Sequence, residues 1–327
     1  MNILRIVLDG EEYPHYTLSK AFEKNFGADN VHTIWWQKYK DLNELNNLII
    51  NTVETNNYDA VFMQLQMDGV INEEAAKAIN KYSLGFNWTG DVRTNIDWYI
   101  RMGKYFITLF TNTTDISKMH LLGLKADYLQ IGYDDKYYFP KESICHNNIV
   151  FCANYYPESD YPLTSLRKDV VYALKREFGD KFNLYGNNWN KCGINAELPF
   201  VGNYDEAEIY RTAAIAINCS HFNYGRYSSD RLLREMASGA FVLTHNYKDL
   251  TADFKDGEHL VSWDNIPDLI KKCHYYLENE AERKRIALAG NEYVQRHCNW
   301  MERLKDFREL IHKYQKISAE TVHGTFI

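Results

Sequence analysis

Residues 226–239 bring together the side chains of this chain that are best suited to bind an anion. The segment follows a strand-like run and contains three residues that commonly cap the N-terminus of a helix: Ser228, Ser229 and Asp230. Arg231 and Arg234 then fall in the first turns, although cations near a helix N-terminus oppose its macrodipole. A phosphate or diphosphate bound there, with Arg226 alongside, would turn this unfavourable arrangement into a binding site.

A purely local interpretation of the same segment stays open. In this alternative, Asp230 pairs with Arg234 four residues later on one helix face, and the other arginines are solvated. Exposed pairs of this kind contribute little to stability. The position of the loop, directly after a predicted strand, favours the binding interpretation.

A second group of candidates lies at the end of the predicted strand 84–88. Asp91 is a candidate catalytic carboxylate, since a desolvated aspartate deprotonates a hydroxyl or stabilises a developing cation. Arg93 is a candidate contact for a substrate, as is His15 in the loop after the first strand. Asp91 alternatively caps a helix that begins near Thr94 or pairs with Arg93, and His15 alternatively faces solvent.

Amide and aromatic side chains follow two further predicted strands. We expect Asn154, Tyr155, Gly186 and Asn187 to form part of a nucleotide site, because amides bind ribose hydroxyls and base edges while aromatic rings stack on bases. The alternative for the second group is an ordinary turn next to a buried indole, that of Trp189.

Strand-like and helix-like segments alternate along the chain, which predicts parallel sheets covered by helices. Strands are expected near residues 3–8, 31–36, 60–65, 84–88, 105–110, 126–131, 148–152, 182–185, 214–219, 240–244 and 260–263. Helices are expected from about residues 17, 41, 72, 94 and 114, and over 165–178, 205–213, 230–238, 266–278, 280–297 and 299–314.

A polar stretch at 134–142 interrupts this alternation and predicts two doubly wound, Rossmann-like α/β domains that face a cleft. We expect an N-terminal domain over 1–140 and a second domain over 141–300. Residues 301–327 are expected to form a terminal helix that packs back on the first domain.

Composition limits the class of protein. The 327 residues carry a formal net charge of −7, which argues against broad affinity for nucleic acid. The sequence contains no long apolar run, no secretory signal and no metal-ligand spacing among its 6 cysteines and 11 histidines. We therefore expect a cytoplasmic protein without a membrane span or a bound metal.

A family resemblance adds to this interpretation. Residues 231–244, RLLREMASGAFVLT, resemble the R-x-x-E-x-x-A-x-G-x-x-x-L segment of GT-B glycosyltransferases of the group 1 type, and within these the CgeB-like spore proteins. Other matches follow in the order of the family: Gly132-Tyr133-Asp134 with Phe139, residues 201–204 with 210–218, and residues 256–261 with 269, 276–277 and 286–290.

The resemblance implies a GT-B fold and a nucleotide diphosphate sugar, such as a UDP-sugar, as co-substrate. Arg231 and Gly239 match the family arginine and glycine. The family glutamate, which holds the donor's ribose, stands five residues before the glycine, where this sequence has Arg234. Glu235 lies one residue closer and is the candidate ribose ligand here. The first glutamate of the family's pair has no counterpart, so a retaining or inverting outcome stays open.

These observations together predict a hexosyl- or pentosyltransferase without a further cofactor. The departing diphosphate would be stabilised by Arg226, Arg231 and the helix terminus, so a metal is not required. The resemblance implies that residues 1–140 form the acceptor domain, with Arg93 and His15 as contacts of the acceptor or the sugar, and that 141–300 form the donor domain. The acceptor is open among a glycan, a protein, a metabolite and a modified nucleobase. The alternatives are a non-catalytic nucleotide-binding protein and an epimerase on the same fold. A dinucleotide dehydrogenase is disfavoured, because no GxGxxG follows the first strand.

Overall fold

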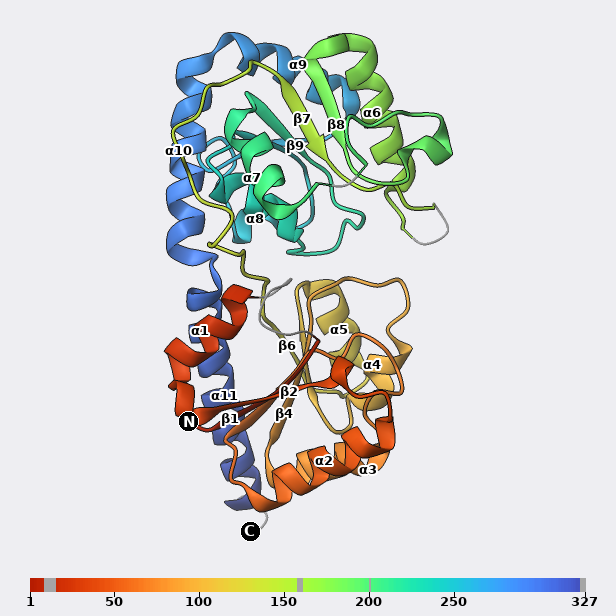
Figure 1. Ribbon diagram of the computed structural model, residues 1–327, viewed down its shortest axis with the longest axis vertical. Coiled ribbons are helices and arrows are strands. Elements are labelled where there is room, and N and C mark those ends of the chain that lie inside the picture. Colours follow the sequence, from red (N-terminus) through yellow and green to blue (C-terminus); the bar gives the residue numbers. More distant parts are fainter. Residues whose placement is uncertain (9–15, 158–160, 200, 324–327) are drawn as a thin grey trace. The chain divides into compact units, whose positions relative to one another are not determined.

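The computed structural model describes residues 1–8, 16–157, 161–199 and 201–323. The chain divides into two compact units (Figure 1). Unit 1 comprises Met1–Gly132 and Trp300–Ile327, and unit 2 comprises Tyr133–Asn299. The chain therefore passes between the units twice.

Unit 1 is built on a parallel sheet of six strands in the order β2-β1-β3-β4-β5-β6. The strands are β1 (Ile3–Val7), β2 (Val31–Trp35), β3 (Ala60–Met63), β4 (Leu84–Thr89), β5 (Ile107–Phe110) and β6 (Ala126–Tyr128). Nearly all their side chains are buried except along the edge strand β2 and in β6, as expected for a parallel sheet covered on both faces.

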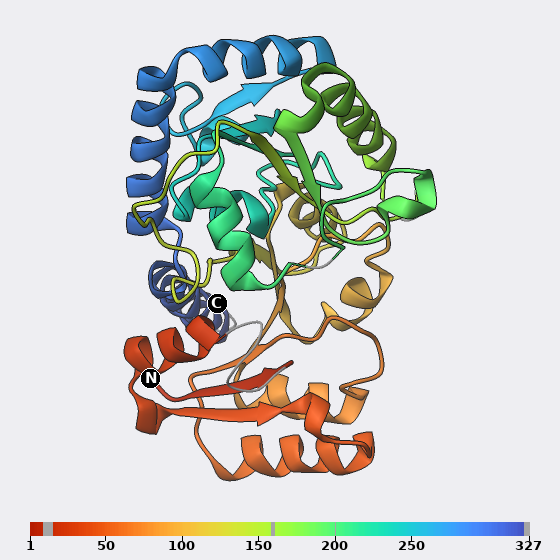
Figure 2. The same cartoon turned by 45° about the horizontal axis from the view of Figure 1, so that its top comes forward.

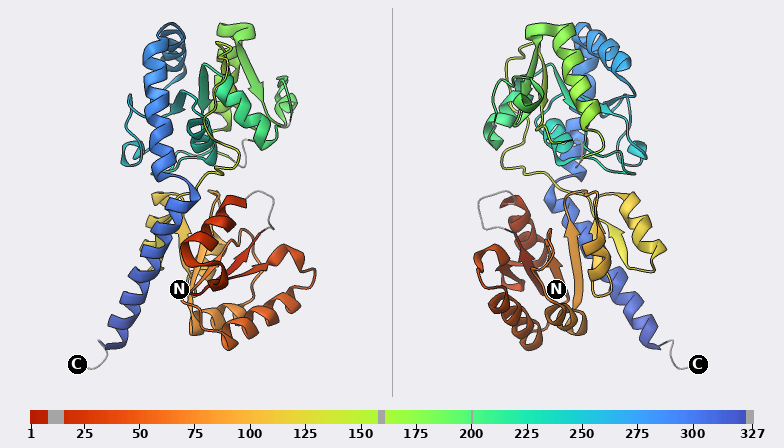
Figure 3. Two further views of the ribbon diagram at one scale, coloured as in Figure 1. Left: turned by 60° about the vertical axis from the view of Figure 1, so that its left-hand side comes forward. Right: turned by 90° about the vertical axis from the view of Figure 1, so that its right-hand side faces the viewer.

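Helices cover both faces of this sheet. Helices α1 (Tyr16–Phe26) and α11 (Trp300–His323) share one core with it, while α2 (Leu42–Thr55) and α3 (Glu73–Tyr82) form the opposite core. Helices α4 (Asp97–Met102) and α5 (Thr113–Leu121) pack near β5 and β6. Figure 3 shows α11 running beside α1 along the sheet.

The sequence of α11 explains its place in unit 1. Its apolar residues recur every three or four positions, and Leu304, Phe307 and Ile311 are all fully buried. The Phe307 ring meets the Phe62 ring edge-on, with 5.1 Å between the centroids. The C-terminal helix is therefore part of the core of unit 1, although it follows unit 2 in the chain.

Unit 2 contains a five-stranded parallel sheet in the order β11-β10-β9-β7-β8 (Figure 2). The strands are β7 (Ile149–Cys152), β8 (Phe182–Tyr185), β9 (Ile215–Asn218), β10 (Val242–His245) and β11 (Val261–Trp263). Helices α6 (Thr164–Phe178) and α9 (Ile266–Glu278) share one core with the sheet.

In unit 2, α8 (Asp230–Ala237) packs against both α7 (Asn203–Thr212) and α10 (Glu280–His297). Short 3-10 turns occur in the two units at Ala28–Asn30, Trp36–Lys38, Gly179–Lys181, Trp189–Cys192 and Leu250–Ala252.

Each sheet has one point at which its strand order reverses. In unit 1 the chain goes from β1 to β2 on one side and then to β3 on the other. In unit 2 it goes from β7 to β8 and then to β9. Open α/β sheets bind ligands outside the carboxyl ends of the strands at such a switch point. The fold thus directs attention to the ends of β7 and β9 in unit 2, and of β1 and β3 in unit 1.

The prediction of two doubly wound α/β domains is confirmed, and the predicted elements recur with small shifts at their ends. Two larger shifts occur: the last helix, expected over 299–314, runs to His323, and the helix expected from Thr94 begins at Asp97. The Asn95 side chain accepts a hydrogen bond from the Asp97 backbone N–H (2.8 Å), so a local turn precedes the helix.

The boundary between the units lies at residues 132 and 133, whereas the sequence suggested 140. The segment after Gly132 is held by α7. The Tyr138 hydroxyl donates to Glu206 (2.5 Å), and Arg211 donates to the Tyr137 carbonyl (2.8 Å). Because of these contacts, the segment that follows Gly132 belongs to unit 2, although the change in composition suggested a later boundary.

Candidate functional site

Arg167 lies at the switch point of unit 2. It comes from the first turn of α6, and its side chain is only 1% exposed. One terminal nitrogen donates to the Asn154 carbonyl after β7 (2.9 Å), and the other donates to the Cys219 carbonyl after β9. The guanidinium thereby joins the carboxyl ends of the two strands between which the strand order reverses.

Arg231 approaches the same place from α8. Its Nη1 donates to the Cys152 carbonyl at the end of β7 (2.8 Å). Its Cζ lies 5.8 Å from the centroid of the Phe151 ring, and the Cζ of Arg167 lies 5.3 Å from that centroid. Among the described residues, no carboxylate forms an ion pair with either arginine.

The two cations are therefore held together by backbone carbonyls and one aromatic ring. Burial and, to a lesser extent, the charge of Arg231 lower the pKa of Arg167 to about 9. Two like charges in one cluster repel each other, and a bound anion would relieve that repulsion. The cluster has the electrostatic character of an anion site.

Two helices begin at this edge of the sheet, and neither has a side-chain cap. The hydroxyls of Thr164, at the start of α6, and of Ser229, just before α8, are buried and have no hydrogen-bond partner among the described residues. A buried hydroxyl without a partner costs about 1–3 kcal/mol. Helix N-termini attract anions, so these hydroxyls are suited to contact phosphate oxygens.

The other two arginines of the predicted cluster are ion-paired. Arg226 forms a two-pronged pair with Asp253, at 2.6 and 3.2 Å. Arg234 pairs with Asp230 four residues earlier (2.6 Å) and also contacts Glu206 (3.3 Å). The local alternative for Asp230 and Arg234 therefore describes their contact in the structure.

His221 lies on the loop after β9, against the two arginines. Its ring contacts the rings of Tyr156 and Tyr161, with centroids 5.2 and 4.5 Å apart. Burial, together with the charges of Arg167 and Arg231, lowers the pKa of His221 to about 2. The imidazole is therefore neutral at physiological pH, and its Nδ1 is buried without a partner among the described residues.

The candidate nucleotide residues connect the loops after β7 and β8. The Asn154 side chain accepts from the Asn187 backbone N–H (2.8 Å), and the Tyr155 N–H donates to the Asn187 carbonyl (2.9 Å). At Gly186, with φ of 129°, a Cβ atom would lie 2.2 Å from the Ala153 carbonyl oxygen, so only glycine fits. The two loops thus form one rigid rim.

The remaining candidates of unit 2 surround α8. Ser228 is buried, and the Asp230 side chain accepts from the Arg231 backbone N–H (2.8 Å). Glu235 is completely buried, and its Oε2 accepts from the Asn218 side chain (3.0 Å). Of these three residues, Asp230 is the most exposed.

The candidates of unit 1 follow β4. Asp91 is exposed, and Arg93 lies beside Tyr99. Burial raises the pKa of Tyr99, and the Arg93 guanidinium opposes that shift. The Nε of Arg93 is buried and lacks a partner among the described residues. His15 lies outside the described residues.

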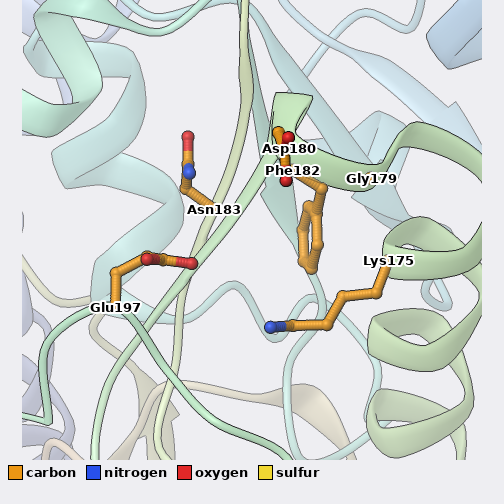
Figure 4. A pocket seen from close by; sticks show the side chains of 6 residues that line it. All are labelled: Lys175, Gly179, Asp180, Phe182, Asn183 and Glu197. Atoms are coloured by element: carbon orange, nitrogen blue, oxygen red, sulfur yellow. The ribbon is translucent and has the colours of Figure 1, made fainter.

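An open depression of unit 2 lies away from these groups (Figure 4). It is lined by Lys175, Gly179, Asp180, Phe182, Asn183 and Glu197. Phe182 is the first residue of β8, so the depression is at the amino end of that strand rather than at the carboxyl edge. We assign it no role in catalysis.

Arg167 is not among the candidates predicted from the sequence, although the sequence contains a signal for it. Like Arg231, it is a cation in the first turn of a predicted helix that follows a strand, and that turn of α6 has no acidic residue. For His221 no comparable signal exists, because its lowered pKa depends on burial and on two cations that the fold brings beside it.

Two features are absent from the described ranges. No cluster of histidine, cysteine, aspartate or glutamate suited to hold a metal ion occurs in them. None of the helices there combines the length and apolar character needed to cross a bilayer.

Comparison with protein families gives one match. Residues 167–309 match the family described as glycosyl transferase-like. The matched segment begins at Arg167 and contains α8. No curated protein matches this chain.

Comparison with solved structures gives similar folds over nearly the whole chain. The Anabaena protein Alr3699/HepE, solved with UDP and glucose, has a TM-score of 0.66 at 11% identity, and the match covers 95% of this chain and 99% of that one. The Thermosynechococcus elongatus sucrose-phosphate synthase gives 0.63 at 11% identity, covering 98% and 100%. A DNA-modifying β-glucosyltransferase gives 0.62 at 13% identity, covering 95% and 100%.

These matches, together with the family match, confirm the resemblance to GT-B glycosyltransferases and the prediction of a glycosyltransferase. The CgeB-like subgroup and the roles of single residues stay predictions.

Proposed function

Starting from a glycosyl transferase-like domain on a GT-B fold, we propose that this chain transfers a sugar from a nucleoside diphosphate sugar, with the diphosphate bound at the β7 and β9 switch point of unit 2. The observation that carries the proposal is the state of the arginines. Arg167 and Arg231 have no carboxylate partner among the described residues, while Arg226 and Arg234 do.

The proposed chemistry follows from charge. When the bond between the sugar C1 and the β-phosphate oxygen breaks, the electron pair stays on that oxygen, and negative charge grows on the diphosphate. Arg231, whose Nη2 makes no hydrogen bond to the described residues, donates to it. The N-termini of α6 and α8, with Thr164 and Ser229, add stabilisation that is fixed before the reaction begins.

In this proposal Asn154, Tyr155, Gly186 and Asn187 bind the nucleoside. The rim that they form is rigid, which suits recognition of a flat base. UDP is the first nucleotide to test, because the Anabaena structures contain UDP or UDP-glucose. Ser228 and Asp230 complete the wall next to α8, and Arg226 supports the loop through Asp253.

We assign the acceptor-side roles to unit 1. Asp91 takes the proton of the acceptor hydroxyl that attacks C1, and Arg93 and His15 contact the acceptor or the sugar. The acceptor belongs to one of four classes: a glycan, a protein, a metabolite or a modified nucleobase. We further propose that the reaction needs no metal, since cationic side chains already face the diphosphate, and that it takes place in the cytoplasm.

The test is a thermal-shift screen with nucleoside diphosphates and their sugars, followed by analysis of the released sugar and its anomeric form. We expect at least one nucleoside diphosphate to stabilise the protein, and Arg231→Ala to abolish that shift. Arg296→Ala, at an exposed arginine of α10, is the matched control. Stabilisation without sugar release in the presence of candidate acceptors would favour a non-catalytic binding protein. No shift with any nucleotide would contradict the proposal.

A further inference from the structure

Glu235 occupies an unexpected environment for a ribose ligand. It lies on α8 one turn after Arg231 and is completely buried. Its Oε2 accepts from the side chain of Asn218, the last residue of β9. The Asn218 side chain in turn accepts from Thr244 on β10 (3.4 Å). Glu235 thus lies inside the unit, between α8 and two strands.

Two complementary polar atoms on neighbouring turns of α8 have no partner among the described residues. The Nε of Arg231, a donor, is buried without a hydrogen bond to them. The Oε1 of Glu235, an acceptor, is in the same state. Residues four apart lie on the same face of a helix, so the unpaired donor and the unpaired acceptor lie on one face of α8. A buried polar atom without a partner is unfavourable, so each of the two atoms would gain from a hydrogen bond.

The charge of Arg231 acts on Glu235. Burial raises the pKa of Glu235, and Arg231 is the strongest influence that opposes this shift, followed by the hydrogen bond from Asn218. The nearby acids Glu206 and Asp230 act in the same direction as burial. Arg231 is therefore the cationic group that favours the ionised state of this carboxyl.

We propose that Glu235 is a positioning residue that acts through Arg231 and does not touch the ribose. When a diphosphate occupies the site, Glu235 Oε1 accepts the Nε–H of Arg231, and the guanidinium keeps its terminal nitrogens for the Cys152 carbonyl and the phosphates. This inference rests on the proposed function. It differs from the role that the family resemblance assigns to a glutamate of this helix.

The helix geometry supports this difference. The family position for the ribose glutamate is that of Arg234, and one residue along a helix turns a side chain by about 100°. Arg234 is partly exposed and ion-paired, whereas Glu235 faces the interior. A ribose contact would require a sugar hydroxyl to reach a carboxyl group that is completely buried.

Two thermodynamic cycles, measured by calorimetric titration, test the proposal. The first compares UDP with 2′-deoxy-UDP in the wild type and in Glu235→Gln. We expect the substitution to weaken both ligands by the same factor, about 5- to 10-fold. A loss for UDP that is absent for 2′-deoxy-UDP would overturn the proposal in favour of a ribose contact.

The second cycle combines Glu235→Gln with Arg231→Lys, because lysine keeps the charge and lacks the Nε–H. We expect the double variant to bind UDP no more weakly than Arg231→Lys alone, because both changes remove one interaction. Multiplied effects would mean that Glu235 acts independently of Arg231 and would overturn the proposal.

Controls separate this inference from the proposed function. Glu292→Gln, at an exposed glutamate of α10, is expected to bind UDP as the wild type does. Thermal unfolding of each variant shows that it is folded. A wild type that binds UDP, with either contrary result above, contradicts only the inference about Glu235. A wild type that binds no nucleoside diphosphate contradicts the proposed function and this inference together.

Discussion

The carboxyl edges of the two sheets carry different chemistry, although the strand order reverses in the same way in both. In unit 2 the switch point holds Arg167 and Arg231, cations without carboxylate partners among the described residues. In unit 1 the buried polar groups at the corresponding edge are mainly neutral, and Gln64 Nε2 and Thr111 Oγ1 have no hydrogen-bond partner in the described part of the chain. One edge is suited to an anion, and the other to uncharged hydroxyl groups.

A similar contrast exists inside unit 2. Four arginines lie near the loop after β9 or near α8, and two of them are neutralised by carboxylates. Arg226 pairs with Asp253, and Arg234 pairs with Asp230 and Glu206, whereas the contacts of Arg167 and Arg231 within the described ranges are with backbone carbonyls and the Phe151 ring. The number of cations in a sequence motif therefore does not show whether the motif can bind an anion. What matters is whether carboxylates already pair with those cations.

The largest effect is expected for Arg231→Ala, which removes the cation facing the diphosphate. We expect sugar release from the donor to fall by about 100- to 1000-fold, the range for loss of one donor to a developing anion. Steady-state kinetics with a UDP-sugar measures it. A fall of less than about 3-fold would contradict the distinction between the arginines without a carboxylate partner, to which Arg231 belongs, and the ion-paired arginines.

Asp91→Asn tests the unit 1 side of the comparison. Loss of a general base lowers turnover by about 100-fold or more. The expected result is this loss in kcat at unchanged UDP affinity, because Asp91 belongs to the acceptor side. Transfer assays and calorimetric titration provide the two numbers. Equal losses of turnover and UDP affinity would assign Asp91 to the donor instead.

Arg167→Met is expected to act on stability and on binding at once. It leaves the Asn154 and Cys219 carbonyls without their donor, which costs about 2–4 kcal/mol of unfolding free energy. We expect UDP affinity to fall by about 10-fold. Urea unfolding and calorimetric titration measure the two effects. Unchanged UDP affinity in a folded variant would make Arg167 a structural residue only.

Arg226→Ala is expected to have a smaller effect on UDP affinity, of less than about 5-fold, since its guanidinium is already paired with Asp253. Asp253→Ala serves as the matched change, because it removes the same pair from the other side. If Arg226→Ala alone weakens UDP binding by about 100-fold, the ion-paired arginine also holds the diphosphate, and the contrast between the two pairs of arginines fails.

The smallest effect concerns pH and His221. Its folded-state pKa of about 2 lies below the ordinary value of 6.5, so the unfolded chain binds a proton that the folded chain does not. Stability therefore falls as the pH drops below about 6.5. Because the ring is partly exposed, we expect a loss of about 1 kcal/mol between pH 7 and pH 5.

His221→Asn removes this contribution, so the comparison is made between the two proteins by thermal or urea unfolding at each pH. The variant should lose less stability than the wild type over the same range. Parallel pH profiles would mean that burial and the charges of Arg167 and Arg231 do not lower the pKa of His221.

The order and type of the elements could be predicted because local patterns determine them. Asp41 and Asn72 mark helix starts, and in the structure both cap helices that begin at the next residue. The short helix that begins at Asp230 has an apolar face that could be predicted, although the expected side-chain cap is not formed. These features depend on residues that are close in the sequence.

The state of the candidate site could be predicted only in part. Asp253 lies 27 residues after Arg226, and Glu206 lies 28 residues before Arg234, so neither pair follows from a local motif. The role of Arg167 depends on carbonyls of two strands brought together by the fold. The sequence pattern indicates a segment suited to an anion, but it cannot distinguish paired from unpaired cations.

The most direct test compares UDP with uridine, which lacks the diphosphate, in the wild type and in Arg231→Ala by calorimetric titration. We predict that the wild type binds UDP at least about 100-fold more tightly than uridine, and that the substitution removes most of this ratio with little change in uridine affinity. An equal preference for UDP in both proteins would contradict the assignment of the diphosphate to the β7 and β9 switch point.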